Sequence, residues 1–328
     1  MSQASSVASI GARSSAPGFT SHRAGFAAVL GDRPRLAPVL ACDAHEGPVY
    51  FPEEDALYFT TLPRRERGVP HVAIRRIQLD GERFPLEPDR LSVVVADASV
   101  ANGMTRGPDG RLVVCEQGTL EEPARIALLD PASGARETLV DAFDGRPLNS
   151  PNDVVAASDG SIWFTDPSYG YLQRFRPRPV IGDCVYRFDG GLSVVAEGFD
   201  KPNGLAFSPD ERVLYVGDSG ANQEPGSYYP ERPHDITAFD VGAGGLTGRR
   251  QFARTTPGFP DGIKVDSEGR VYASSSSGVQ VFAPGGGLLG EIRLPGAVNF
   301  TFGGPGRNVL FITADDAVWA AVLEAKGA

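Results

Sequence analysis

Short apolar runs separated by polar turns recur along this chain at intervals that suit strands and not helices. One pattern occurs six times: a polar residue, a short apolar run, a turn rich in Gly, Pro or Asp, and a second run rich in aromatic and β-branched residues. From the leading residue to the start of the second run there are 10 or 11 positions in every copy. This constant spacing predicts one repeated β-hairpin. The six leading residues are Glu46, Asn102, Asn152, Asn203, Asp261 and Asn299.

The distance between copies indicates how many strands each repeat contains. Successive leading residues lie 38 to 58 positions apart, which is typical of a four-stranded propeller blade with its loops. Most copies are also preceded by another strand-like run, such as LSVVVAD, LSVVAEGF or LLGEIRL, that would form the outer edge of the blade before. We therefore predict an all-β fold, a six-bladed β-propeller.

The two ends of the chain are expected to meet in the last blade. After the second run of the sixth copy only AVWAAVLEAKGA remains, enough for a third strand but not a fourth. The segment RLAPVLAC at residues 35–42 has the composition of the missing strand, and its pairing there would remove two open sheet edges. We predict an N-terminal extension at residues 1–34, with at most a short helix in residues 18–30, and a single propeller domain at residues 35–328.

Composition and charge narrow the choice of partners. The 328 residues include 40 Gly and 27 Pro, which suits many turns, and the formal net charge is -10. Nucleic acid and anionic membranes require basic patches, so neither is expected as a partner. The three cysteines are widely separated and lack C-x-x-C spacing, which suits a reducing compartment. The sequence has no run of 18 apolar residues. We therefore expect a cytoplasmic protein whose partner is a small molecule.

The six leading residues should converge around one mouth of the central channel, because the innermost strand of each blade lines that channel. Two carboxylates and four amides would then face the axis. Oxygen ligands of this kind suit a hard divalent cation. Asn-Gly and Asp-Gly are also common turn sequences, so the same residues could instead cap loops. Two acids among four amides at one repeat position favour the cation site.

Residues at the ends of the second strands should lie on the same face as the leading residues. Tyr169 and Tyr171 of the PSYGY loop would form a pocket wall, and His45 would hydrogen-bond a substrate from its place beside Glu46. The serines at residues 274–277 would keep the channel mouth open with their small side chains. The acids that end second strands, and that we expect near the site, are Glu116, Asp166 and Asp218.

Several separated segments carry a family resemblance: EGPVYF, LNSPNDVV, SIWFTDPSYG, KPNGLAFSPD and PDGIKVDSEG. From residue 36 onward the chain resembles the senescence marker protein, gluconolactonase and luciferin-regenerating enzyme family of six-bladed propellers, and especially its bacterial gluconolactonase branch. The resemblance implies that Glu46, Asn203 and Asp261 are metal ligands, and that Asn152 either holds the ion or orients substrate beside it. Some animal members carry an Arg for sugar hydroxyls two residues before this Asn, where the present chain has Ser150.

The resemblance also implies a reaction, the metal-dependent hydrolysis of a sugar lactone as in gluconolactonases. The cofactor would be one divalent cation, Ca²⁺ in the first place, with Mn²⁺, Mg²⁺, Zn²⁺ and Fe²⁺ as alternatives. Asp261 would be the catalytic base, and Asn152, Asn102, Tyr169 and His45 would bind substrate. Two other interpretations stay open: a phosphotriesterase-like hydrolase on the same scaffold, and a non-catalytic binding propeller with a structural metal.

Overall fold

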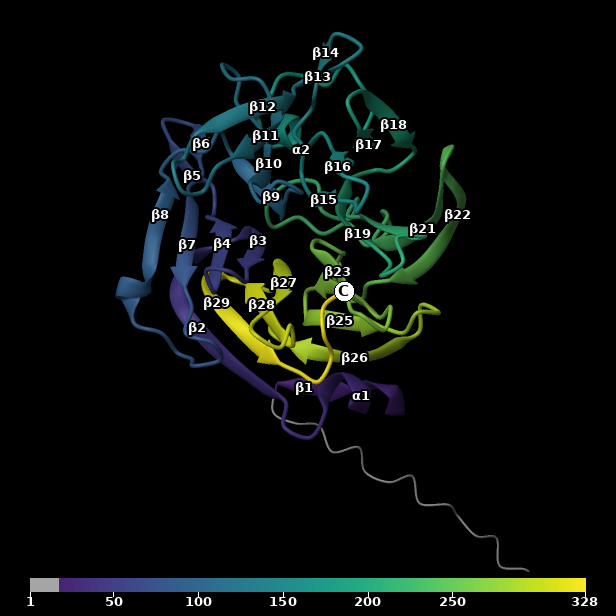
Figure 1. Ribbon diagram of the computed structural model, residues 1–328. Coiled ribbons are helices and arrows are strands. Elements are labelled where there is room, and N and C mark those ends of the chain that lie inside the picture. Colours follow the sequence, from purple (N-terminus) through teal and green to yellow (C-terminus); the bar gives the residue numbers. More distant parts are fainter. Residues whose placement is uncertain (1–17) are drawn as a thin grey trace, which may run out of the picture.

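The computed structural model describes residues 18–328, in which nearly all regular structure is β-strand. Six antiparallel sheets are arranged around a central axis like the blades of a propeller (Figure 1). In the first four blades the strands follow one another from the axis to the periphery in chain order. The predicted six-bladed β-propeller is confirmed.

The first four blades are each built from one continuous stretch of chain. Blade 1 contains β3 (Glu46–Phe51), β4 (Ala56–Thr60), β7 (Ile74–Gln78) and β8 (Leu91–Val95). Blade 2 contains β9 (Ala101–Arg106), β10 (Leu112–Glu116), β11 (Arg125–Leu129) and β12 (Arg136–Val140). Blade 3 contains β15 (Val154–Ala156), β16 (Ile162–Asp166), β17 (Cys184–Phe188) and β18 (Leu192–Ala196). Blade 4 contains β19 (Pro202–Phe207), β20 (Val213–Asp218), β21 (Asp235–Gly242) and β22 (Gly245–Arg254).

The last two blades are completed by N-terminal strands. Blade 5 contains β23 (Ile263–Val265), β24 (Val271–Ser275), β25 (Gly278–Phe282) and β26 (Leu288–Arg293), with β1 (Phe19–Ser21) as a fifth strand. Blade 6 contains β27 (Asn299–Gly303), β28 (Val309–Thr313) and β29 (Asp315–Val322), with β2 (Arg35–Ala44) as its outermost strand. The β2–β29 pairing runs from Arg35 opposite Val322 to Ala44 opposite Asp315. The predicted closing strand therefore exists and extends two residues beyond the predicted end.

The remaining elements are short and lie outside the six blades. Two small hairpins pair β5 (Arg64–Glu66) with β6 (Val69–His71) and β13 (Ala142–Phe143) with β14 (Arg146–Pro147). The helical segments are η1 (Ala24–Phe26), α1 (Ala27–Leu30), η2 (Pro88–Arg90) and α2 (Tyr169–Leu172). Within residues 18–328 no helix combines the length and apolarity needed to cross a membrane.

Part of the expected N-terminal extension packs against the propeller. Residues 1–17 lie outside the described part of the chain. In the rest, Phe19, Phe26 and Val29 are buried in the cluster that joins blades 5 and 6. The short helix expected in residues 18–30 corresponds to α1 with η1 in front of it.

The apolar core is divided among the six interfaces between neighbouring blades. Each of the six buried clusters combines residues of two adjacent blades, for example Tyr58 and Val114 between blades 1 and 2, or Val185 and Val216 between blades 3 and 4. The second strands are buried on both faces because a neighbouring blade covers each face. The circular packing holds the axial ends of all blades in fixed positions.

Glycines after four of the leading residues allow neighbouring blades to approach closely at the axis. Gly103 and Gly204 donate backbone hydrogen bonds to the carbonyl oxygens of Asn152 and Asp261 in the next blades, at 2.8 and 3.0 Å. A Cβ atom at Gly103 would lie 2.5 Å from that Asn152 oxygen, and Cβ atoms at Gly204 and Gly262 would collide with the next blade in the same way. The E-G, N-G and D-G pairs thus serve contacts between blades.

Candidate active site

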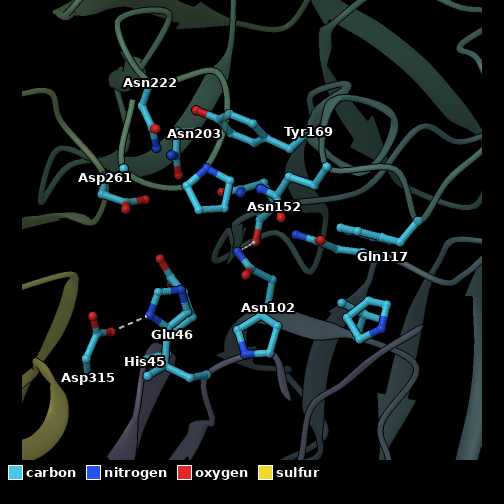
Figure 2. A pocket seen from close by; sticks show the side chains of 18 of the residues that line it. His45, Glu46, Asn102, Gln117, Asn152, Tyr169, Asn203, Asn222, Asp261 and Asp315 are labelled. Atoms are coloured by element: carbon cyan, nitrogen blue, oxygen red, sulfur yellow. Dashed lines mark hydrogen bonds and ion pairs between the residues drawn. The ribbon is translucent and has the colours of Figure 1, made fainter. Parts of the chain in front are cut away.

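A cavity of about 460 Å³ opens at one mouth of the central channel. Figure 2 shows its side chains converging from several blades. The structure brings together all seven residues that the sequence analysis proposed as ligands or substrate contacts. They are His45, Glu46, Asn102, Asn152, Tyr169, Asn203 and Asp261.

Two carboxyl groups, of Glu46 and Asp261, point into this cavity from blades 1 and 5 (Figure 2). Desolvation raises the pKa of both carboxyls, and each is raised further by negative charge on its neighbours, including Asp153. Glu46 is 3% exposed and accepts hydrogen bonds from Gly47 N at 3.0 Å and Asn299 Nδ2 at 2.7 Å. A positive charge between the two carboxylates would offset their mutual repulsion.

Two amide side chains complete this part of the cavity. Asn152 and Asn203 are 6% and 3% exposed, and both line the cavity. The Oδ1 atom of Asn152 is buried and has no hydrogen-bond partner among residues 18–328. A buried amide oxygen without a partner costs free energy, so this atom is available for a ligand.

Two buried aspartates fix the backbone that carries these amides. Asp166 accepts hydrogen bonds from the backbone N–H groups of Asn149 and Ser150, at 2.8 and 2.7 Å. Asp218 does the same for Asp200 and Lys201, at 3.0 and 2.8 Å. In both cases the two held residues precede a Pro-Asn pair whose Asn faces the cavity. The aspartates therefore position Asn152 and Asn203 from outside.

The expectation that the acids ending second strands would lie near the site needs correction. Asp166 and Asp218 do not line the cavity, because their carboxylates are turned toward backbone N–H groups. Glu116 is fully buried and forms ion pairs with Arg125 at 2.5 Å and Arg136 at 3.1 Å. Its charge is thus balanced within blade 2.

Asn102 and Asn299 share the repeat position but have contacts of their own. Asn102 lines the cavity and donates from Nδ2 to the carbonyl oxygen of Asn152 at 3.0 Å, a bond that uses one of its two amide hydrogens. Asn299 does not line the cavity and uses its amide group on Glu46 and on the backbone N–H of Phe300. Only Asn102 of these two is therefore placed to contact a substrate.

His45 is held by an acid from blade 6. Its Nδ1 donates to Asp315 Oδ1 at 2.7 Å, and both residues line the cavity (Figure 2). Burial opposes protonation of the imidazole, but the Asp315 hydrogen bond and the Glu46 charge outweigh it and raise the His45 pKa. Asp315 was missed by the sequence analysis because it comes from a third strand, outside the repeated hairpin.

The tyrosine loop contributes one residue to the cavity and not two. Tyr169 is 5% exposed, lines the cavity and donates from Oη to the carbonyl oxygen of Ser219 at 3.4 Å. Tyr171 is 45% exposed and does not line it, so the prediction for Tyr171 is wrong. Gln117 and Asn222 also face the cavity, and no pattern in the sequence marks either of them.

The donor set suits a cation that prefers oxygen. Within residues 18–328 no group of three or more His, Cys, Asp and Glu side chains could hold a metal ion. The cavity floor instead offers two carboxylates, of Glu46 and Asp261, and the amide oxygens of Asn152 and Asn203. The unpartnered Asn152 oxygen and the mutual repulsion of the carboxylates both fit a hard divalent cation.

Known proteins are similar to this chain in both sequence and architecture. A model of the SMP-30/Gluconolactonase/LRE-like region matches residues 44–316. A gluconolactonase of Zymomonas mobilis is 35% identical over 297 residues, covering 84% of this chain and 78% of that protein. The lactonohydrolase oryL of Aspergillus oryzae is 30% identical over 321 residues, covering 89% and 69%. A solved gluconolactonase structure from Xanthomonas campestris superposes with a TM-score of 0.75 at 35% identity, covering 93% of this chain and 94% of that one.

Proposed function

The chain belongs to the SMP-30/gluconolactonase/LRE-like family, and from this premise we propose that it is a metal-dependent lactonase acting in the axial cavity. The observation that carries the proposal is the pair of facing carboxyl groups, Glu46 and Asp261, among amide side chains on the cavity floor. The names of the similar proteins make a sugar lactone such as glucono-δ-lactone the first substrate to test.

A divalent cation, Ca²⁺ in the first place, would be held by oxygen atoms of four residues. When bound, such a cation polarises the lactone carbonyl group as a Lewis acid. The unpartnered Asn152 oxygen and the two carboxylates support this assignment. The four residues are Glu46, Asn152, Asn203 and Asp261.

Asp261 acts as the base in this proposal. Its carboxylate lines the cavity, and a carboxylate in this position can accept a proton from an attacking water molecule. The water oxygen bonds to the carbonyl carbon while its proton moves to Asp261. The carbon–oxygen bond of the ring then breaks, and the proton passes to the departing ring oxygen to give the hydroxy acid.

The remaining residues bind and orient the substrate. Asn102 has one amide hydrogen left to donate to a lactone oxygen, beside Asn152. His45 presents its Nε2 side to the cavity because Asp315 holds Nδ1. Tyr169 closes one wall and limits access of bulk water.

Hydrolysis of glucono-δ-lactone followed by pH-stat, with Ca²⁺ and with a chelator, tests the proposal. We expect Asp261→Ala to abolish turnover and tight cation binding, while Asp189→Ala, an exposed acid on the outer hairpin of blade 3, changes neither. Turnover that persists in Asp261→Ala with no cation bound would exclude this mechanism. An aryl phosphotriester in the same assay tests the phosphotriesterase alternative, because only a phosphotriesterase would hydrolyse it in preference to lactones.

A binding propeller with a structural metal predicts a different outcome. Neither ester would then be hydrolysed, with or without Ca²⁺. A lactonase keeps its fold on chelation and loses turnover, which circular dichroism recorded beside the pH-stat measurement distinguishes.

A further inference from the structure

A second cavity, of about 330 Å³, opens beside Asp261 between blades 5 and 6. It shares Phe259, Asp261 and Asp315 with the axial cavity, so the two spaces meet at the proposed base. The rest of its wall consists of residues 274–276 and 296–298. We call this space the serine pocket. Its position allows one molecule to occupy both spaces.

Two of the three serine hydroxyls on the wall of the serine pocket are already hydrogen-bonded within the protein. The Ser274 hydroxyl accepts from the backbone N–H of Asp261 at 2.9 Å, and the Ser275 hydroxyl donates to the Gly278 carbonyl oxygen at 3.1 Å. Ala297 and Val298 add aliphatic surface, and Phe259 adds an aromatic ring at the border. On the side of Ala297 and Val298 the hydroxyl groups of a hydroxylated chain would lack partners.

Charge excludes another class of occupant. The only ionisable groups on the pocket wall are the acids Asp261 and Asp315 at the shared border. A carboxylate or phosphate substituent would face these acids without a cationic side chain from the pocket wall. The two acids would attract a cationic group only at the border, where the proposed divalent cation is bound. The aliphatic side of the pocket, at Ala297 and Val298, favours an uncharged, mainly aliphatic group.

The position of Ser150 agrees with a substrate that is not rich in hydroxyls. Ser150 is fully buried, and its Oγ donates to the Pro167 carbonyl oxygen at 2.6 Å and accepts from Gly170 N at 3.0 Å. Because Ser150 is buried and does not line the axial cavity, its hydroxyl is not available to a sugar hydroxyl there. The axial cavity also has apolar lining, with Leu62, Pro70 and Phe175, beside polar groups such as Arg65 and Gln173.

We propose that the serine pocket is a subsite for a short alkyl substituent on the lactone ring, and that Phe259 separates it from the space for the ring itself. The proposal rests on the lactonase function. The lactone group lies over the carboxylates and amides of the axial cavity, and the alkyl chain extends past Phe259 between blades 5 and 6. Small side chains at residues 274–276 leave the room that the chain fills.

A series of δ-lactones tests this subsite: δ-valerolactone without a substituent, then the methyl-, propyl- and pentyl-substituted rings. Burial of one methylene group is worth about a fourfold gain. We expect kcat/KM of the Ca²⁺-loaded protein to rise by about this factor per carbon until the pocket is full. In Ser276→Phe and in Val298→Phe the ratio of pentyl to unsubstituted lactone should fall to about one. Ser193→Phe, at an exposed serine on β18, is the matched control and should keep the wild-type ratio.

Two results would overturn the subsite. One is that the wild-type protein hydrolyses δ-valerolactone or glucono-δ-lactone, but kcat/KM does not rise along the alkyl-substituted series. The other is a wild-type chain-length ratio in both folded pocket variants. Failure of every lactone to react would instead refute the lactonase function on which the subsite depends.

Discussion

Asn203 and Asn299 stand at the same position of the repeat, on blades 4 and 6, but the protein uses them differently. Asn203 faces the axial cavity beside Asp261 (Figure 2). Asn299 lies outside the cavity, donates to Glu46 Oε2 at 2.7 Å and accepts from Phe300 N at 2.8 Å. A shared repeat position thus places both amides near the axis without giving them the same role. The role follows from where the amide group lies: Asn203 interacts with Asp261 and Tyr169 inside the cavity, whereas Asn299 binds Glu46 from outside it.

The backbone before each Asn differs as well. Asn203 follows Pro202, and the two residues before that Pro are held by Asp218. Asn299 follows Val298, whose backbone N–H instead binds the Thr313 carbonyl oxygen at 2.9 Å. The blade 4 strand is therefore fixed by a buried charge, while the blade 6 strand is fixed by an ordinary backbone contact. The same charged arrangement recurs at Asp166 for Asn152.

The largest difference should appear when each amide is removed. Asn203→Ala deletes a proposed ligand oxygen, and we expect Ca²⁺ affinity to fall by about 100-fold or more. Asn299→Ala leaves the ligand set intact but removes one hydrogen bond to Glu46, with a smaller loss of about tenfold, as expected for groups that orient ligands. Isothermal titration calorimetry measures both. Equal losses in the two variants would contradict the division of roles between these amides.

Removal of the charge behind Asn203 should have an intermediate effect. Asp218→Asn keeps the shape but replaces one acceptor oxygen by an N–H₂ group that faces a backbone N–H. We expect a 10- to 100-fold loss of Ca²⁺ affinity, the range for residues that position metal ligands. Asp189→Asn, an exposed acid in an outer turn, is the matched control. If Asp218→Asn lowers the melting temperature and leaves Ca²⁺ affinity unchanged, Asp218 supports the fold alone.

The repeated hairpin predicted the blades, the closing strand and the set of residues that meet at the axis, because these depend on strand periodicity. The same periodicity could not show which way a side chain turns at a strand end. Asp166 and Asp218 were expected near the site for this reason, but the N–H groups of a loop some 16 to 18 residues earlier attract their carboxylates. Asp315 was beyond prediction because tertiary packing alone brings blade 6 beside His45.

The glycine after Asn203 tests whether close approach of the blades sets the ring geometry. A Cβ at Gly204 would collide with the carbonyl oxygen of Asp261 in the next blade. We expect Gly204→Ala to lower the free energy of unfolding by about 1–3 kcal/mol, as for other overpacked positions. Gly191→Ala is the control, since nothing lies within 4 Å of a Cβ built there. Chemical denaturation measures both, and equal stability of the two variants would show that the blades can separate without cost.

The smallest expected effect concerns pH and the carboxyls that these amides contact. In the cation-free protein the pKa of Glu46 is raised to about 8 and that of Asp261 to about 7, chiefly by desolvation. The folded state then binds more protons than the unfolded state between about pH 4 and pH 8, so its stability decreases as pH rises through this window.

Glu46→Gln removes one of the two groups. Over the same pH range its melting temperature should therefore fall by a few degrees less than that of the wild-type protein. Saturating Ca²⁺ should abolish most of the decrease in the wild-type protein, because the cation binds only the deprotonated carboxylates. Thermal melts at pH 5, 6.5 and 8, with chelator and with Ca²⁺, measure these slopes. Parallel slopes for wild type and Glu46→Gln in chelator would mean that Glu46 is already ionised in the folded protein, with Asn299 as a sufficient partner for its charge.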